Sequence, residues 1–189
     1  MLYDTIIIGG GPAGLTAAIY SIRAGKKILL FEREVIGGQV AYTSMVENYT
    51  GIKHIDGGTL SAMMLEHAKS LGVEINYSEV IDIDFSDKIK KVITHKGTFD
   101  TKTIILCLGA SAKKLNLENE KLLLGKGVSY CATCDGNFFK DKIVAVVGGG
   151  STSLEDTIYL SNIAKKVYLI KRRQEFNGEK ILCDKVITC

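Results

Sequence analysis

Two cysteines separated by two residues form the part of the sequence best suited to chemistry. Cys131 and Cys134 stand in the segment Cys-Ala-Thr-Cys-Asp, so the next residue, Asp135, is a carboxylic acid. Two thiols at this spacing can form a small disulfide, and a local positive potential lowers the pKa of a thiol and makes it reactive. Asp135 can donate or accept the proton that such chemistry moves. We therefore predict a redox-active pair with a carboxyl group available beside it.

The remaining cysteines do not supply a metal site. Of the five cysteines in the chain, Cys107, Cys183 and Cys189 stand singly. A structural zinc site and an iron–sulfur cluster each need about four ligands, which come most often in closely spaced pairs. We therefore expect no metal, and we interpret these three residues as inert structural thiols.

A glycine-rich loop near the N-terminus has the spacing of a dinucleotide-binding site. It follows the apolar run 4–8 and opens the helical segment 13–24. In this pattern the first glycine permits a tight turn, the second lets the backbone approach a pyrophosphate, and the third lets the helix pack closely on the strand. The pyrophosphate binds to N–H groups at the helix N-terminus. The residues of this loop are Gly9, Gly11, Pro12, Ala13 and Gly14.

An acid at the end of the next strand sharpens this interpretation. Glu32 follows the predicted strand 27–31 and lies 18 residues after Gly14. A carboxylate at this place can accept hydrogen bonds from ribose hydroxyls and would repel a 2′-phosphate. The first site therefore suits the adenosine half of FAD or NAD rather than NADP. The alternative is a purely structural glycine turn.

A second strand–loop–helix–strand unit occupies 142–170, and its loop carries Gly148, Gly150 and Ser153 in the pattern Gly-x-Gly-x-x-Ser. Arg172 lies 19 residues after Ser153, where the first unit has its glutamate, and Arg173 follows it. Guanidinium groups pair bidentately with phosphate, which favours NADPH at this second site and FAD at the first. The alternative is that the basic run is a solvated strand end.

The two repeated units predict an α/β fold with two Rossmann-like dinucleotide-binding domains, the second of them incomplete. We place the boundary in the polar segment 111–124, which gives an FAD-binding domain at 1–112 and an NADPH-binding, redox-disulfide domain at 113–189. Between the two glycine loops we expect a helix and four short strands, at 59–71, 73–77, 80–85, 89–94 and 103–108.

Composition excludes several classes of function. The net charge of +3 is too small to indicate nucleic acid or an anionic membrane as a partner. No apolar run approaches the roughly 20 residues that span a bilayer, and the first residues carry no basic cluster typical of a signal peptide. We therefore expect a cytoplasmic protein.

Taken together, the motifs resemble those of the low-molecular-weight, bacterial-type NADPH-dependent thioredoxin reductases. The segment Cys-Ala-Thr-Cys-Asp is the most specific of them, and the resemblance runs over the whole chain. The matching stretches are 7–14, 37–39, 46–49 with Gly51, 127–136, the second glycine loop, and 172–173.

The resemblance implies a role for individual residues. It implies that Cys134 faces the flavin, that Cys131 exchanges with a thioredoxin or thioredoxin-like protein, and that Asp135 serves as acid or base. It also implies that the two arginines hold the 2′-phosphate of NADPH and that the complete protein is a homodimer. The residues that it implies for the FAD site are Glu32, Gly38, Gln39 and Asn48.

The sequence departs from the family pattern in three residues and in length. Lys171 replaces a usual His, Asn177 replaces a usual Arg, and Ser153 replaces a small Ala or Gly, so the preference for NADPH over NADH stays open. Family members also return from the second domain to the first, and we expect this chain to be truncated at its C-terminus. Two alternatives therefore remain: a ferredoxin-dependent flavin thioredoxin reductase, and a truncated non-catalytic flavin-binding module or fragment.

Overall fold

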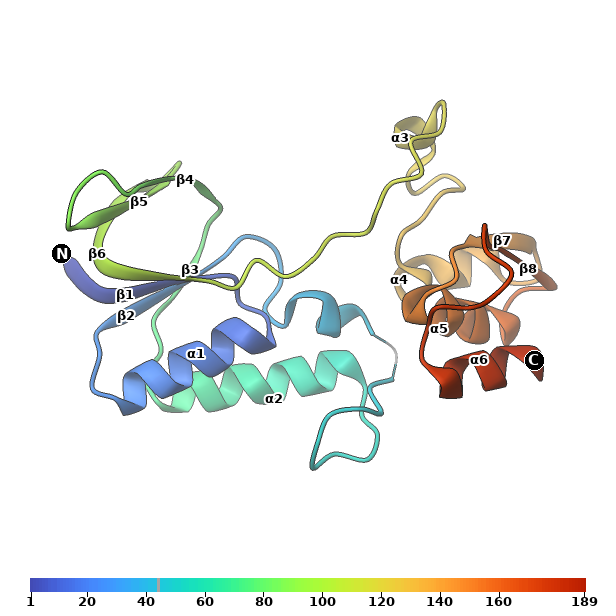
Figure 1. The fold of residues 1–189 in the computed structure, drawn as a ribbon, viewed down its shortest axis with the longest axis horizontal. Coiled ribbons are helices and arrows are strands. Elements are labelled where there is room, and N and C mark those ends of the chain that lie inside the picture. The colour runs from blue at the N-terminus through green and yellow to red at the C-terminus, as the bar shows by residue number, and fades with distance from the viewer. Residues whose placement is uncertain (44) are drawn as a thin grey trace. The chain divides into compact units, whose positions relative to one another are not determined.

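The computed structural model describes residues 1–43 and 45–189, and it divides into two compact units, Met1–Ser111 and Ala112–Cys189 (Figure 1). The sequence placed its boundary between residues 112 and 113. Each unit contains parallel strands joined through a helix, which confirms the predicted α/β class with Rossmann-like units.

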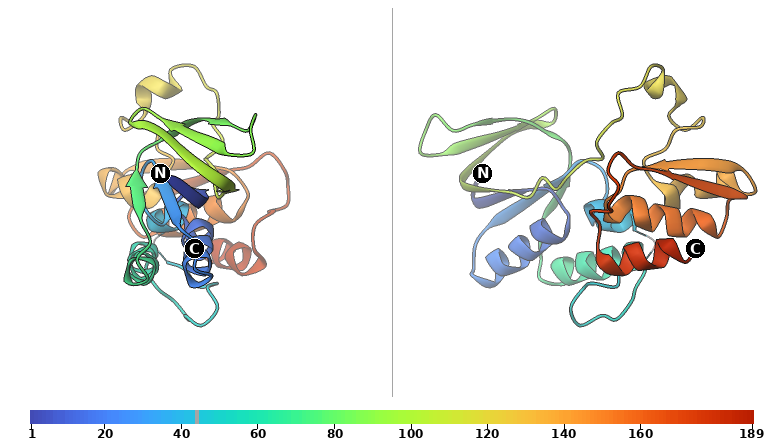
Figure 2. Two further views of the ribbon diagram at one scale, coloured as in Figure 1. Left: turned by 90° about the vertical axis from the view of Figure 1, so that its left-hand side faces the viewer. Right: turned by 45° about the vertical axis from the view of Figure 1, so that its right-hand side comes forward.

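The first unit is built on a six-stranded sheet with the strand order β3-β2-β1-β6-β5-β4. Helices α1 and α2 pack against each other, and both views of Figure 2 place them on the same side of this sheet. A short 3₁₀ helix, η1 (Gly38–Tyr42), precedes α2. The strands and helices of this unit are β1 (Leu2–Ile8), α1 (Pro12–Arg23), β2 (Ile28–Glu32), α2 (Gly57–Ser70), β3 (Ile75–Tyr77), β4 (Val80–Asp84), β5 (Lys90–Thr94) and β6 (Gly97–Leu106).

The second half of the central strand β1 is buried on both faces, which explains its apolar run at 6–8. Its alternate side chains enter two separate clusters. Ile7 packs with Leu15 of α1 and Leu30 of β2 on the helix-covered face. Ile6 packs on the opposite face, in a cluster that includes Phe31 and Val92. The carboxyl ends of β1, β2 and β6 are therefore fixed side by side, and the first glycine loop leaves the sheet at this edge.

Strand β6 is longer than the sequence predicted. The prediction began at residue 103, whereas the strand begins at Gly97 and pairs with both β5 and β1. The first half of the strand was not predicted because its residues are mostly polar. One of them, Thr101, is fully buried, and its hydroxyl donates to the carbonyl of Thr103, 2.8 Å away. A buried threonine satisfied by the backbone does not register in a pattern of apolar residues.

The second unit contains a two-stranded parallel sheet, β7 (Ile143–Val147) and β8 (Lys166–Ile170). Helix α5 (Ser151–Ser161) joins these strands, and α6 (Lys180–Ile187) packs on α5. Leu154 of α5 is fully buried, with Leu160, Leu182 and Val146 also in the core. Three short helices precede the sheet: α3 (Glu120–Leu123), α4 (Ala132–Asp135) and η2 (Gly136–Phe139). Among the helices in the described part of the chain, none has the length and apolar character needed to cross a membrane.

Candidate functional site

The first glycine loop is shaped by close approaches of the backbone. Gly9 has a φ of 107°, and a Cβ atom there would lie 2.1 Å from the carbonyl oxygen of Cys107. A Cβ on Gly14 would lie 1.8 Å from the carbonyl oxygen of Gly9. At Gly11 the nearest atom would be the carbonyl oxygen of Gly37, 3.9 Å away. Two glycines are therefore required by packing, while the third keeps one side of the loop open to a ligand.

The open side of this loop lies at the N-terminus of α1. Gly11 is the N-cap, no side chain caps the helix, and Pro12 begins it. The first N–H groups of a helix have no partner within the helix, and they favour an anion. Ala13 and Gly14 present such groups, so the local backbone suits a pyrophosphate.

Glu32 is buried and holds the glycine loop in place. One carboxylate oxygen, Oε2, accepts from the backbone N–H of Gly10 at 2.7 Å, and the other, Oε1, accepts from that of Glu34 at 2.8 Å. Each oxygen keeps a further lone pair, so a ribose hydroxyl could still donate to it. Sequence reasoning missed Gly10, where a Cβ would lie 2.5 Å from Cδ1 of Ile36.

The segment that follows β2 returns to the same loop. The N–H of Gly37 donates to the carbonyl of Gly10 at 2.8 Å, and a Cβ on Gly38 would lie 3.5 Å from Cα of Gly11. The side chain of Gln39 donates from Nε2 to the carbonyl of Ala110 at 2.7 Å. Gly38 and Gln39 are thus positioned beside the loop.

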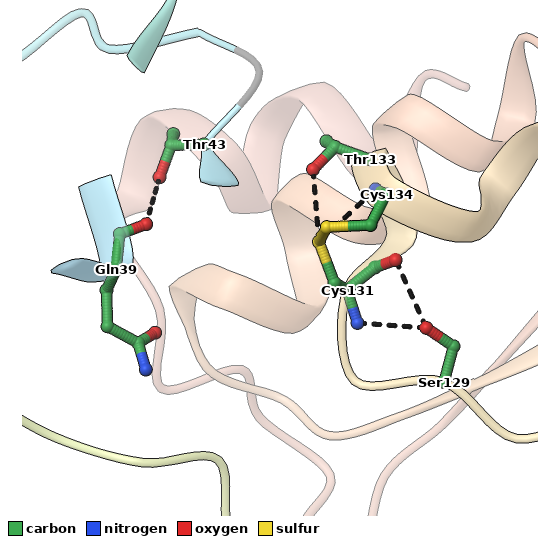
Figure 3. The surroundings of a disulfide bond; sticks show 6 residues. All are labelled: Gln39, Thr43, Ser129, Cys131, Thr133 and Cys134. Atoms are coloured by element: carbon green, nitrogen blue, oxygen red, sulfur yellow. Dashed lines mark hydrogen bonds between the residues drawn. A yellow bond between two sulfur atoms is a disulfide. The ribbon is translucent and has the colours of Figure 1, made fainter. Parts of the chain in front are cut away.

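Asn48 is not brought into this group. It is exposed in the loop between η1 and α2, and the described residues give it no hydrogen bond to the glycine loop. The loop that contains Asn48 begins at Thr43, whose hydroxyl donates to the carbonyl of Gln39 at 3.4 Å (Figure 3). A role for Asn48 at the FAD site therefore stays a prediction.

The second glycine loop accommodates its serine by a hydrogen bond. Ser153 is buried, and its Oγ donates to the carbonyl of Gly150 at 2.8 Å. Gly148 has a φ of 152°, and a Cβ there would lie 2.8 Å from Cβ of Ser153, whereas a Cβ on Gly150 would meet nothing within 4 Å. The serine is therefore compatible with the turn and leaves the surface at Gly150 open.

The two arginines follow β8, beside the loop that follows β7, because Val147 pairs with Ile170 at the ends of these parallel strands. Arg172 and Arg173 are exposed, and within residues 1–43 and 45–189 neither forms an ion pair. Both guanidinium groups are thus available to an anion.

The two departures nearby have partners of their own. Lys171 places Nζ 3.8 Å from the ring centroid of Phe176 and donates to the carbonyl of Gln174. The backbone N–H of Asn177 donates to the carbonyl of Gly149 at 2.9 Å. Asn177 therefore holds the segment between β8 and α6 against the glycine loop, and this backbone contact does not need the charge of an arginine.

Cys131 and Cys134 form a disulfide, as the spacing allowed, with a Cα–Cα distance of 5.3 Å. Cys131 is the N-cap of α4, and its Sγ accepts from the N–H of Cys134 at 3.2 Å and lies 3.4 Å from Oγ1 of Thr133 (Figure 3). Cys131 is half-buried and Cys134 is exposed. After reduction, the same donors would stabilise a thiolate on Cys131.

Ser129 fixes the backbone of Cys131 and was missed by sequence reasoning. Its Oγ accepts from the N–H of Cys131 at 3.0 Å and lies 3.1 Å from the carbonyl oxygen of the same residue (Figure 3). That carbonyl also accepts from the N–H of Asp135 at 3.2 Å. A lone serine two residues before a cysteine carries no sequence signal, because only the folded turn brings the groups together.

A second carboxylate, Asp156 on α5, was also missed. It is half-buried and accepts a hydrogen bond from the backbone N–H of Ala132, between the two cysteines. Burial, with a contribution from the charge of Glu155, raises the pKa of Asp156 to about 6, although the hydrogen bond opposes this rise.

The single cysteines differ from one another. Cys107 and Cys183 are half-buried, and burial raises the pKa of the Cys107 thiol. Cys189 is exposed, and its interpretation as an inert structural thiol stays a prediction. In the described residues, no group of three or more His, Cys, Asp or Glu side chains is arranged to hold a metal ion.

Comparison with known proteins gives a consistent set of relatives. The family model "Pyridine nucleotide-disulphide oxidoreductase" matches residues 3–185. A thioredoxin reductase of Bacillus subtilis is 44% identical over 181 residues, which cover 96% of this chain and 57% of the relative. A thioredoxin reductase of Buchnera aphidicola is 47% identical over 187 residues, which cover 98% of this chain and 57% of the relative.

A solved structure is similar over nearly the whole chain. The crystal structure of Lactococcus lactis thioredoxin reductase matches with a TM-score of 0.94 and 42% identity, and the match covers 97% of this chain and 60% of that one. The chain thus spans less than two thirds of the length of these relatives.

Proposed function

The chain belongs to the pyridine nucleotide-disulphide oxidoreductase family, and from this premise we propose that it is part of a thioredoxin-disulfide reductase. Electrons pass from NADPH through FAD to the Cys131–Cys134 disulfide, and from there to a disulfide of a thioredoxin-like protein. The observation that carries this proposal is the disulfide itself, which lies in the same compact unit as a nucleotide-type glycine loop.

The first unit would hold FAD. Its loop leaves backbone N–H groups open at α1, and Glu32 has lone pairs left for ribose hydroxyls, so the residues present fit the adenosine and pyrophosphate parts of this group. When bound, FAD accepts a hydride from NADPH and supplies two electrons for disulfide reduction. The residues that we assign to this site are Gly9, Gly11, Pro12, Ala13, Gly14, Glu32, Gly38, Gln39 and Asn48.

The second unit would hold NADPH. Gly148, Gly150 and Ser153 form the loop for its pyrophosphate, and Arg172 and Arg173 would bind the 2′-phosphate. The exposed and unpaired state of both guanidinium groups supports this assignment. Because Nζ of Lys171 lies over the ring of Phe176 and Asn177 carries no charge, we propose a preference for NADPH that depends on the two arginines.

The dithiol then carries out exchange. After two electrons break the Cys131–Cys134 bond, the Cys131 thiolate is stabilised by the N–H of Cys134 and attacks one sulfur of the partner's disulfide, releasing the other as a thiolate. Cys134 next attacks Cys131 in the mixed disulfide, which restores the internal bond and frees the second partner sulfur. Asp135 accepts or donates the protons that these sulfurs exchange.

The order of the motifs requires motion between the units. The dithiol and the nicotinamide site both belong to the second unit, yet both must reach one flavin in the first. We therefore propose a rotation with a hinge near 111–117, a segment without helix or strand. A crosslink that locks the two units should abolish turnover and leave FAD bound. Unchanged turnover in the locked protein would exclude the rotation.

Two alternatives differ in the source of electrons and in catalysis. A ferredoxin-dependent reductase has no need of Arg172, Arg173 and an open second glycine loop, and their presence supports NADPH instead. A non-catalytic flavin-binding module would bind FAD without turnover.

In the cell we place the reductase in the cytoplasm, where thiols are kept reduced, as a homodimer of the full-length protein.

The visible absorption spectrum of the purified chain, before and after anaerobic addition of NADPH, tests the proposal. A flavin spectrum that bleaches within seconds supports the NADPH-dependent reductase. A flavin spectrum that persists with NADPH but bleaches with reduced ferredoxin supports the first alternative. A colourless protein would assign FAD binding to the longer relatives and not to this chain.

A further inference from the structure

Asp156 contacts the segment that carries the redox pair, although it is outside the cysteine motif. It stands in the middle of α5 and accepts the N–H of Ala132, the residue that directly follows Cys131. The packing here is close, because a Cβ on Gly136 would lie 2.8 Å from Cε1 of Tyr159, one turn further along α5. Asp156 and Tyr159 share a helix face. The disulfide segment is therefore fixed on the face of α5 that carries this carboxylate.

The Asp156 carboxylate and a thiolate of the reduced pair would both place a negative charge at the same turn. The N–H of Cys134 points to Sγ of Cys131, and the N–H of Ala132 points to Asp156. Two amides of one turn, those of Ala132 and Cys134, thus serve two groups that can each carry a negative charge. Two anions held by amides of the same turn disfavour each other, so ionisation of one raises the pKa of the other.

We infer that Asp156 is a positioning residue that couples reduction of the Cys131–Cys134 pair to uptake of a proton. The inference rests on the proposed redox function of this pair. Two electrons break the sulfur–sulfur bond, and one sulfur takes up a proton from water. A second proton is shared between the other sulfur and the Asp156 carboxylate, so the two groups titrate as a pair.

The charges around α5 set the range of pH in which this coupling acts. On α5 itself Glu155 repels the ionised form of Asp156, and burial adds to the effect, so that Asp156 titrates near pH 6 in the disulfide form. Strand β7 carries no titratable residue. The titratable residues of the other elements packed on α5 are Cys131, Cys134 and Asp135 at α4, Lys166 and Tyr168 on β8, and Lys180, Cys183, Asp184 and Lys185 on α6.

The test is the pH dependence of the thiol–disulfide equilibrium in the whole 189-residue chain. The protein is equilibrated with oxidised and reduced dithiothreitol between pH 5 and 8, trapped by alkylation, and the peptide with Cys131 and Cys134 is quantified by mass spectrometry. The variant Asp156→Asn keeps an oxygen that can accept the N–H of Ala132 but removes the charge. We expect it to favour the dithiol about fivefold at pH 7 and to raise the rate of Cys131 alkylation at pH 6.5 by a similar factor.

Asp184→Asn is the matched control, because it removes an exposed carboxylate from the same unit. It should leave the equilibrium and its pH profile unchanged. A folded Asp156→Asn protein with the wild-type pH profile would overturn the inference, since a merely structural carboxylate would be replaced by the amide without this effect.

The wild-type protein supplies a second measurement that does not depend on any variant. Its equilibrium constant should change slope against pH near pH 6, and a profile without this inflection would also overturn the coupling. A pair that dithiothreitol does not reduce at any pH would overturn the proposed redox function instead.

Discussion

The two glycine loops have the same strand–loop–helix plan but are stabilised differently. The first is held by an acid: Glu32 is buried and accepts two backbone N–H groups, one of them from Gly10 inside the loop. The second is held by neutral groups, the hydroxyl of Ser153 and the backbone of Asn177, while Arg172 and Arg173 stay exposed. In the first unit the residue proposed for the ligand also supports the fold, and in the second unit the two tasks fall on different residues.

The largest expected effect comes from adding a methyl group to a loop glycine. Gly14→Ala places a Cβ 1.8 Å from the carbonyl oxygen of Gly9, so α1 must shift away from β1, at a cost of about 3 kcal/mol in the free energy of unfolding. Gly150→Ala enters open space and should change this free energy by less than about 0.5 kcal/mol. Urea denaturation compares the two, and equal losses would contradict the difference between the crowded position at Gly14 and the open one at Gly150.

Replacement of Glu32 tests whether the acid supports the fold. Glu32→Ala leaves the N–H groups of Gly10 and Glu34 without their acceptor, which should cost about 2 kcal/mol of stability. Glu32→Gln keeps one acceptor oxygen and should cost about half as much. The exposed Glu79→Gln is the control. Full stability of Glu32→Ala with lost FAD binding would show that the carboxylate serves only the ligand.

Replacement of the arginines should lower the affinity for the nucleotide and leave the stability of the fold unchanged. Arg172→Ala and Arg173→Ala remove exposed side chains, so each should change stability by less than about 0.5 kcal/mol. Loss of a charged hydrogen bond to phosphate costs about 2 kcal/mol, so the affinity for 2′,5′-ADP should fall by more than tenfold, while that for 5′-AMP stays the same. Calorimetric titration measures both. An equal loss for the two nucleotides would place the arginines away from the 2′-phosphate.

The features that sequence predicted and those that it missed differ in physical origin. Both glycine loops, the strands around them and the cysteine pair follow from local patterns, since apolar runs and glycine spacing are read along the chain. Gly10, Ser129 and Asp156 escaped notice because their partners become neighbours only after folding. Helix α4 was missed because four residues are too few to show a helical period.

The smallest expected effect concerns Asp156, the acid of the second unit, compared with Glu32, the acid of the first. Glu32 has two backbone donors, whereas Asp156 has one from Ala132 and the repulsion of Glu155, and its pKa rises to about 6. A carboxyl that binds its proton more tightly in the folded state stabilises the fold less as pH rises from the unfolded pKa, about 4, through the folded one. Wild-type stability should therefore fall by about 1–2 kcal/mol between pH 4 and 7 relative to Asp156→Asn. Urea denaturation of both proteins across this range measures the difference, with Asp184→Asn expected to follow the wild type. Parallel profiles of wild type and Asp156→Asn would mean that the Ala132 hydrogen bond already offsets the cost of burying the charge.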